Sequence, residues 1–137
     1  YKMVFVPEAK VYHLKHPSNI REYWQKKFNI GYWKVVVHKH HPDKLWRDSH
    51  TPQMLKLQIL LVGFMLLFLL AGVIWMPFVW ASTLMGLVFL LSTIPFMFKA
   101  WPKDKIVALA SPGLLFLRAL ALGTGFASGL LFNLRQR

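Results

Sequence analysis

Basic side chains dominate the residues of this sequence that could do chemistry. Seventeen lysines and arginines face only five aspartates and glutamates, so the formal net charge is +12. None of the five carboxylates is paired at the spacing of an Asp-x-Asp element, and neither a GxGxxG turn nor a phosphate loop occurs. We therefore expect no catalytic residue within this chain.

Histidine is the other residue type that could bind a ligand here. His38, His40 and His41 cluster, and His13 and His16 are three residues apart, a pattern that resembles a metal site. No acidic residue accompanies them at helical spacing, and the sequence has no cysteine. We interpret these histidines as basic, headgroup-facing residues and expect no metal ion. The absence of histidine after residue 50 excludes axial imidazole ligands to a haem in the apolar second half.

Aromatic and basic residues alternate in one segment ahead of that apolar half. This segment, residues 21–34, reads REYWQKKFNIGYWK, and Trp24, Phe28 and Tyr32 recur in it every four residues. The spacing predicts a helix that lies in a membrane surface, with its aromatic face in the lipid and its cations near anionic headgroups. Membrane lipids of the inner leaflet are therefore its expected partners.

The start of this helix is also marked in the sequence. Ser18 or Asn19 can cap it, because either side chain accepts a hydrogen bond from an otherwise unpaired amide. Glu22 then lies in or near the first turn, where a negative charge is favourable.

An uncharged run of 42 residues, residues 57–98, dominates the second half. About 20 apolar residues suffice for one bilayer-spanning helix, so this run is long enough for two. Pro77 stands near its middle and predicts a turn there. We expect membrane helices over residues 55–75 and 78–98.

A third apolar segment, residues 106–134, contains Arg118 and the small residues Ala121, Gly125 and Gly129. Such small-residue ladders let helix backbones approach closely, so we predict helix packing there. An arginine within the hydrocarbon costs about 2.5–3.5 kcal/mol on insertion scales, so Arg118 should reach an interface or find a partner.

The path of this third segment is open in three ways. It crosses the membrane, which we favour, or its first half lies along the cytoplasmic surface, or it dips in and returns. A returning segment would leave Arg135 and Arg137 cytoplasmic and would satisfy the positive-inside rule better.

Orientation follows from where the cations stand. Eleven of the 17 lysines and arginines precede residue 57 and three lie in residues 99–105, so both regions are expected to be cytoplasmic. Aromatic side chains are expected near the membrane interfaces, with Arg118 at the boundary; these are Tyr32, Trp33, Trp75 and Trp101. We expect an integral protein of a bacterial inner membrane.

Residues 1–13 alternate in polarity well enough for two short strands around Pro7 and Glu8. The expected fold is a mainly α membrane protein. Residues 1–53 would form a short β segment and an amphipathic interfacial helix, and residues 54–137 would form two to three transmembrane helices.

Two phrases of the first half resemble the carboxy-terminal part of membrane-bound family 2 glycosyltransferases. They read VFVPEAKVYHLKHPSNIREYWQKKFNIGYWK and HHPDKLWRDSHTPQMLKLQ, and paired membrane helices follow. In that family a strand phrase of the type YxxVFVPEAxVxH is followed by an interfacial helix with a Q-x-x-R-W type signature. The resemblance implies a sugar transfer from a nucleotide-sugar donor to a lipid-phase acceptor.

The resemblance also implies roles for single residues. Lys27 takes the position of the signature arginine, Phe28 that of the tryptophan, and Trp24 that of the glutamine, with Gln25 beside it. A cation here would lie near the diphosphate and an aromatic ring would lie against the acceptor. His13 ends the strand phrase and would approach the acceptor site.

Two functions from different classes remain. The chain is either the membrane-anchoring end of such a glycosyltransferase or a non-catalytic transmembrane scaffold subunit of a larger membrane complex. Tyr1 opens a strand-like segment without lead-in, so we expect a fragment; any divalent metal would belong to a missing amino-terminal domain. We expect no nucleic-acid partner, because the cations flank membrane segments.

Overall fold

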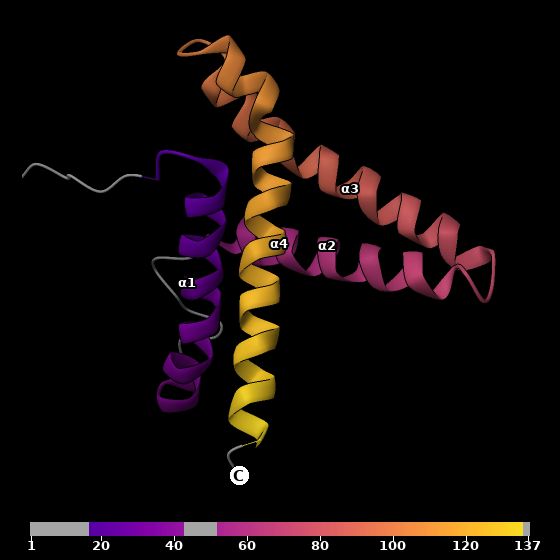
Figure 1. Cartoon of the computed structure of the whole chain (residues 1–137). Helices are drawn as coiled ribbons and strands as arrows, with labels where there is room; N and C mark the ends of the chain where they lie inside the picture. Colours follow the sequence, from indigo (N-terminus) through magenta and orange to yellow (C-terminus); the bar gives the residue numbers. More distant parts are fainter. Residues whose placement is uncertain (1–16, 43–51, 136–137) are drawn as a thin grey trace, which may run out of the picture.

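The computed structural model describes residues 17–42 and 52–135, and within them the regular structure is helical (Figure 1). Four helices follow one another: α1 (Ile20–His40), α2 (Gln53–Ala71), α3 (Pro77–Ala100) and α4 (Lys105–Arg135). The expectation of a mainly α chain is confirmed. The two short strands predicted around Pro7 lie outside the described residues.

Helix α1 begins at the predicted cap. The side chain of Asn19 accepts a hydrogen bond of 2.9 Å from the backbone amide of Glu22. The Glu22 carboxylate in turn accepts 2.9 Å and 3.1 Å bonds from the backbone amide and the hydroxyl of Ser18. These reciprocal bonds satisfy amides that have no partner inside the helix, so the helix starts here.

Helices α2 and α3 form the hairpin that the uncharged run predicted. Helix α2 ends at Ala71, before the predicted end at residue 75, and the amide of Gly72 donates to the Phe68 carbonyl oxygen at 2.8 Å. Pro77 occupies the first turn of α3, where its fixed φ is already helical and its missing N–H costs nothing. The chain needs the residues between these two helices to reverse direction, although their side chains are as apolar as those of a helix.

Polar side chains join the two helices of the hairpin. Gln58 is buried, and its amide nitrogen donates to the Ser92 hydroxyl at 3.1 Å. The Ser82 hydroxyl donates to the Met65 carbonyl oxygen at 2.8 Å. In an apolar pair of helices such bonds fix the register of one helix against the other.

Helix α3 changes direction toward its carboxy-terminal end (Figure 1). Pro95 lies inside the helix and has no N–H to donate to the preceding turn. In that turn the hydroxyls of Ser92 and Thr93 donate to the carbonyl oxygens of Phe89 and Leu90, at 2.6 Å and 2.7 Å. The bend directs the end of α3 toward the start of α4.

Helix α4 is continuous through Pro112 and covers the whole third apolar segment. Its first turn is capped by Asp104, whose carboxylate accepts bonds of 2.8 Å and 3.1 Å from the amides of Ile106 and Val107. Phe116 packs edge-on against Phe89 of α3, with ring centroids 5.8 Å apart. This contact belongs to a small core in which all three apolar helices meet; its buried members are Leu61, Val62, Phe89 and Ala119.

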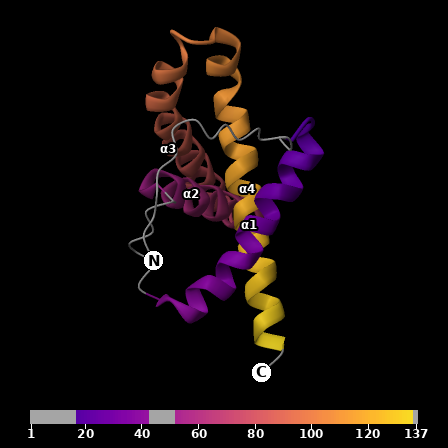
Figure 2. The same ribbon diagram turned by 90° about the vertical axis from the view of Figure 1, so that its left-hand side faces the viewer.

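The four helices are not a parallel bundle. Helix α2 runs crosswise to α4, and the hairpin projects away from it on one side (Figures 1 and 2). Helix α1 crosses α4 on another side and, among the described helices, packs on α4 alone. The molecule therefore has two arms, a crossed pair α1–α4 and a hairpin α2–α3, joined where the hairpin meets the middle of α4.

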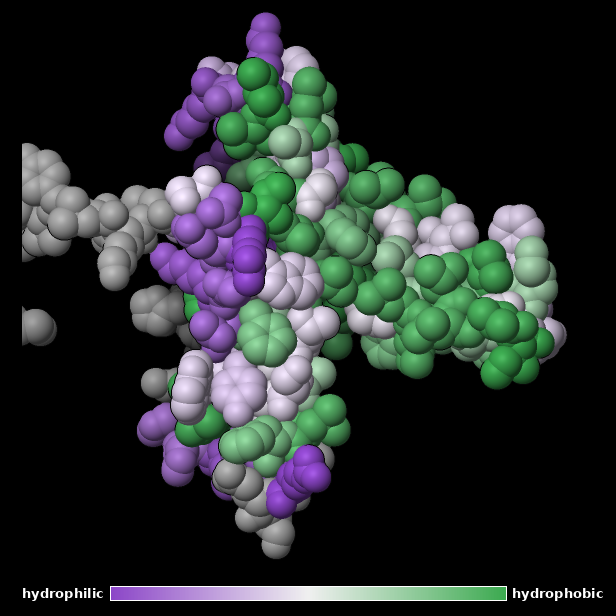
Figure 3. Space-filling model, viewed as in Figure 1, coloured by the Kyte–Doolittle hydropathy of each residue, from purple (hydrophilic) through white to green (hydrophobic). Residues whose placement is uncertain are grey.

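Large apolar side chains cover the outside of the hairpin, whereas polar residues gather over α1 (Figure 3). By length and hydropathy, three described helices could each cross a membrane: Gln53–Ala71, Pro77–Ala100 and Lys105–Asn133. The fold is therefore compatible with an integral membrane protein.

Candidate functional site

The crossing of α1 and α4 is built on glycines. A Cβ atom added to Gly125 would fall on the carbonyl group of Phe28, and one added to Gly31 would fall on the carbonyl oxygen of Leu122. Backbone atoms of the two helices are thus in direct contact, which no larger residue would permit.

A third glycine extends this contact by one turn. A Cβ atom on Gly129 would lie 2.7 Å from the Tyr32 carbonyl oxygen and 2.9 Å from a methyl group of Val35. Ala121, one turn before Gly125, is fully buried. The small-residue ladder of α4 therefore lies against the aromatic and basic helix α1.

Three side chains of chemical interest meet above this crossing. The ammonium nitrogen of Lys27 lies 5.3 Å from the centre of the Tyr23 ring, in a cation–π contact. Arg118 of α4 approaches both residues from the facing helix. Its Nε atom is buried and has no hydrogen-bond acceptor among the described residues. We call Tyr23, Lys27 and Arg118 the cation cluster.

The electrostatics of the cluster are those of positive charges without a counter-ion. Burial lowers the pKa of Lys27, and the positive charges of Arg118 and Lys26 lower it further. Burial raises the pKa of Tyr23, while Arg118 opposes this effect. Both described carboxylates are engaged elsewhere, Glu22 in the cap of α1 and Asp104 in the cap of α4.

The other residues carried over from the glycosyltransferase resemblance lie on the same helix. Trp24 is partly buried, Gln25 is exposed, and Phe28 is partly buried with its backbone against Gly125. His13 lies outside the described residues. Helix α1 thus places Trp24, Lys27 and Phe28 within one turn, with two of these near α4 atoms.

The aromatic residues predicted for the membrane interfaces are spread over the molecule. Tyr32 packs against Trp33 at 5.4 Å and against Phe132 at 6.2 Å, measured between ring centroids. Trp33 itself is 62% exposed. Trp75 in the hairpin turn and Trp101 at the end of α3 are also exposed, at opposite ends of α3.

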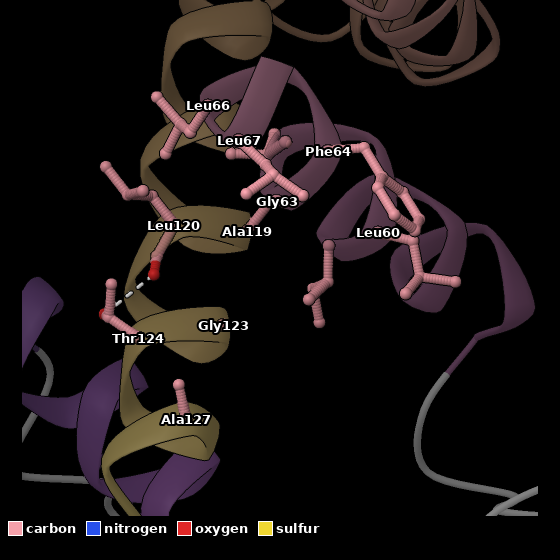
Figure 4. A pocket seen from close by; sticks show the side chains of 12 residues that line it. Leu60, Gly63, Phe64, Leu66, Leu67, Ala119, Leu120, Gly123, Thr124 and Ala127 are labelled. Carbon is pink, nitrogen blue, oxygen red and sulfur yellow. Dashed lines mark hydrogen bonds between the residues drawn. The ribbon is translucent and has the colours of Figure 1, made fainter. Parts of the chain in front are cut away.

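An apolar groove of about 360 Å³ runs between α2 and α4 (Figure 4). The wall from α4 consists of small residues, with Ala119, Gly123 and Ala127 on successive turns, and bulky side chains such as Leu60 and Phe64 form the wall from α2. The hydroxyl of Thr124 is turned inward to the Leu120 carbonyl oxygen at 2.8 Å. The groove therefore offers almost no polar group and suits a hydrocarbon chain.

Sequence reasoning missed two features of this region. It placed Arg118 at a membrane boundary, not beside Lys27, because the partner of a residue on another helix cannot be read from spacing. It also gave no role to Gly31, although a glycine inside a helix costs about 1 kcal/mol relative to alanine and so indicates a packing requirement. The groove has no sequence signal, since small residues and leucines are common in membrane helices.

Comparisons of the chain with protein-family models, with curated proteins and with solved structures found no match. In the described part of the chain, no three histidine or acidic side chains gather closely enough to hold a metal ion.

Proposed function

We propose that this chain is the membrane-anchoring portion of a glycosyltransferase that moves a sugar from a nucleotide-sugar donor to a lipid-phase acceptor. The observation that carries the proposal is the contact between α1 and α4. It holds Trp24, Lys27 and Phe28 at the edge of an apolar assembly instead of leaving them on a free surface helix.

The chemistry of a lipid-phase transfer fits this arrangement. A departing nucleoside diphosphate gains negative charge, which a nearby cation such as Lys27 stabilises. An acceptor with a long hydrocarbon chain needs an apolar channel beside the reacting end, and the groove between α2 and α4 has that lining. Donor-binding and base residues would come from a segment of the polypeptide outside this chain.

A non-catalytic scaffold is the second candidate, and one observation favours it. The sequence contains no pair of carboxylates that could hold a donor metal and act as a base. On this alternative the exposed apolar side chains of α2 and α3 would pack on other membrane subunits.

The test is sugar transfer by the native polypeptide in its own membranes. Trp24→Ala, Lys27→Gln and Phe28→Ala, combined, should lower transfer of labelled sugar to extracted lipid by roughly 100-fold, the scale of losing transition-state contacts. A control that combines Arg21→Gln, Asn29→Ala and Ile30→Ala changes exposed positions of the same helix. It should keep transfer and membrane retention. Equal transfer by both variants would favour the scaffold.

A further inference from the structure

We propose that Lys27 and Arg118 bind a phosphate group at the crossing of α1 and α4. The inference deepens the proposed function by adding a second cation from a different helix, but its test requires no sugar transfer. Three features of the described structure carry it: an excess of positive charge, a hydrogen-bond donor that lacks an acceptor, and the position of the cluster between the polar and apolar parts of the molecule.

The charge excess is local. Within the described residues no carboxylate pairs with Lys27 or Arg118, and Lys26 adds a third positive charge nearby. Like charges at close range destabilise each other when water is partly excluded. A phosphate group carries up to two negative charges and would neutralise both side chains at once.

The lone donor gives the site its geometry. The Nε–H of Arg118 is buried and finds no acceptor in the described structure, a state that costs free energy unless an acceptor arrives. Arginine binds phosphate oxygens in a bidentate manner with two adjacent N–H groups, and Nε can supply one of them. The Arg118 side chain as a whole is only half-buried, so an anion can reach the guanidinium group.

The position of the cluster selects phosphate over other anions. It lies where the polar surface of α1 meets the apolar helix α4, the level at which lipid phosphates occur in a membrane. The same chemistry would hold a soluble diphosphate. The two sources share the phosphate group, and separate ligands distinguish them.

Calorimetric titration of the full chain in neutral detergent tests the site. One arm uses short-chain phosphatidic acid and the other uses inorganic pyrophosphate. Lys27→Gln and Arg118→Gln should each weaken binding of the preferred ligand roughly tenfold or more, because each removes a charge-assisted bond. Arg118→Lys should fall between, since lysine keeps the charge but lacks the fork.

Lys26→Gln and Arg135→Gln are the matched controls, because each removes one exposed cation from the same two helices. They should bind within about twofold of the unchanged protein. Binding in the lipid arm assigns the site to a headgroup, and binding in the pyrophosphate arm assigns it to a soluble diphosphate. Failure of both arms, or equal weakening by the controls, overturns the proposal. If Arg118→Gln does not fold, Lys27→Gln and Arg118→Lys decide the result.

This outcome is separable from that of the proposed function. Phosphate binding that persists in a protein without sugar transfer would refute the transferase and leave the site. Transfer without measurable binding to the cluster would refute the site and leave the transferase.

Discussion

At the scale of single residues, Gly125 decides whether α1 can stay on α4. The carbonyl group of Phe28 occupies the space where any side chain would begin, and a backbone group cannot move aside as a flexible side chain can. The sequence alone drew attention to Gly125 through its spacing from Gly129. It could not show that the partner is α1, because a ladder of small residues fits any helix that approaches it.

The first prediction compares two alanine substitutions on the same helix. Gly125→Ala should separate α1 from α4 and destabilise their contact by about 1–3 kcal/mol, the usual cost of overpacking. Gly113→Ala meets no atom within 4 Å and should be neutral or stabilise α4 by up to about 1 kcal/mol. Hydrogen exchange of α1 amides in detergent measures the difference. Equal protection in the two variants would contradict the close contact.

At the scale of whole elements, the first turn of α1 depends on one carboxylate. The bonds from Ser18 lower the pKa of Glu22 below its ordinary value of 4.5, with a smaller effect from Asn19. A carboxyl group whose pKa is lower in the folded state stabilises that state above its unfolded pKa. The contribution is lost as the pH falls through the folded pKa.

The second prediction follows from that sign. The amide of Ser18, which donates to the Glu22 carboxylate at 2.9 Å, should shift in an NMR titration with a midpoint below pH 4.5. Fraying of the first turn of α1 should accompany the shift. Glu22→Gln should remove the titration and leave that turn equally frayed at neutral pH. A midpoint at or above 4.5 would contradict the cap bonds.

The third prediction concerns the hairpin. Gln58→Leu removes the bond to Ser92 and should destabilise the packing of α2 on α3 by roughly 0.6–1.7 kcal/mol, the range for such bonds between membrane helices. Ser92→Ala should cost a similar amount, and the double variant should cost little more than either alone. Thr83→Ala is the control, because its hydroxyl bonds only to its own helix. Unfolding in mixed micelles measures all four, and simple additivity would contradict the bond.

The elements themselves were largely predictable, whereas their arrangement was not. Residue types located the start of α1 at Asn19 and the turn at Pro77, because caps and proline act locally. The apolar continuity of residues 72–75 predicted a longer α2 than the structure has, since hydropathy does not distinguish a helix from an apolar turn. Nothing in the spacing of α1 indicated that its aromatic face would meet α4, because a membrane and an apolar helix attract the same residues.

At the scale of the whole molecule, the crosswise course of α2 and α4 limits the membrane topology. Helices that span a bilayer usually tilt by no more than about 40° from its normal. With the α2–α3 hairpin inserted, α4 would lie near the membrane surface, and α1 would cover the face of α4 that carries Arg118. This is the surface arrangement that the sequence left open beside a third crossing, and it places every cation of α4 on one side.

The fourth prediction tests that topology with a chain that has no cysteine, so that each introduced thiol is the only one. Met76→Cys, Lys103→Cys and Arg135→Cys mark the hairpin turn, the loop before α4 and the end of α4. In sealed vesicles an impermeant maleimide should label Met76→Cys from the side opposite to Lys103→Cys. Arg135→Cys should react on the same side as Lys103→Cys, because α4 returns to the side from which it starts. A third crossing would place positions 103 and 135 on opposite sides, and the cation cluster would then lie within the hydrocarbon, where two charges without an anion are costly.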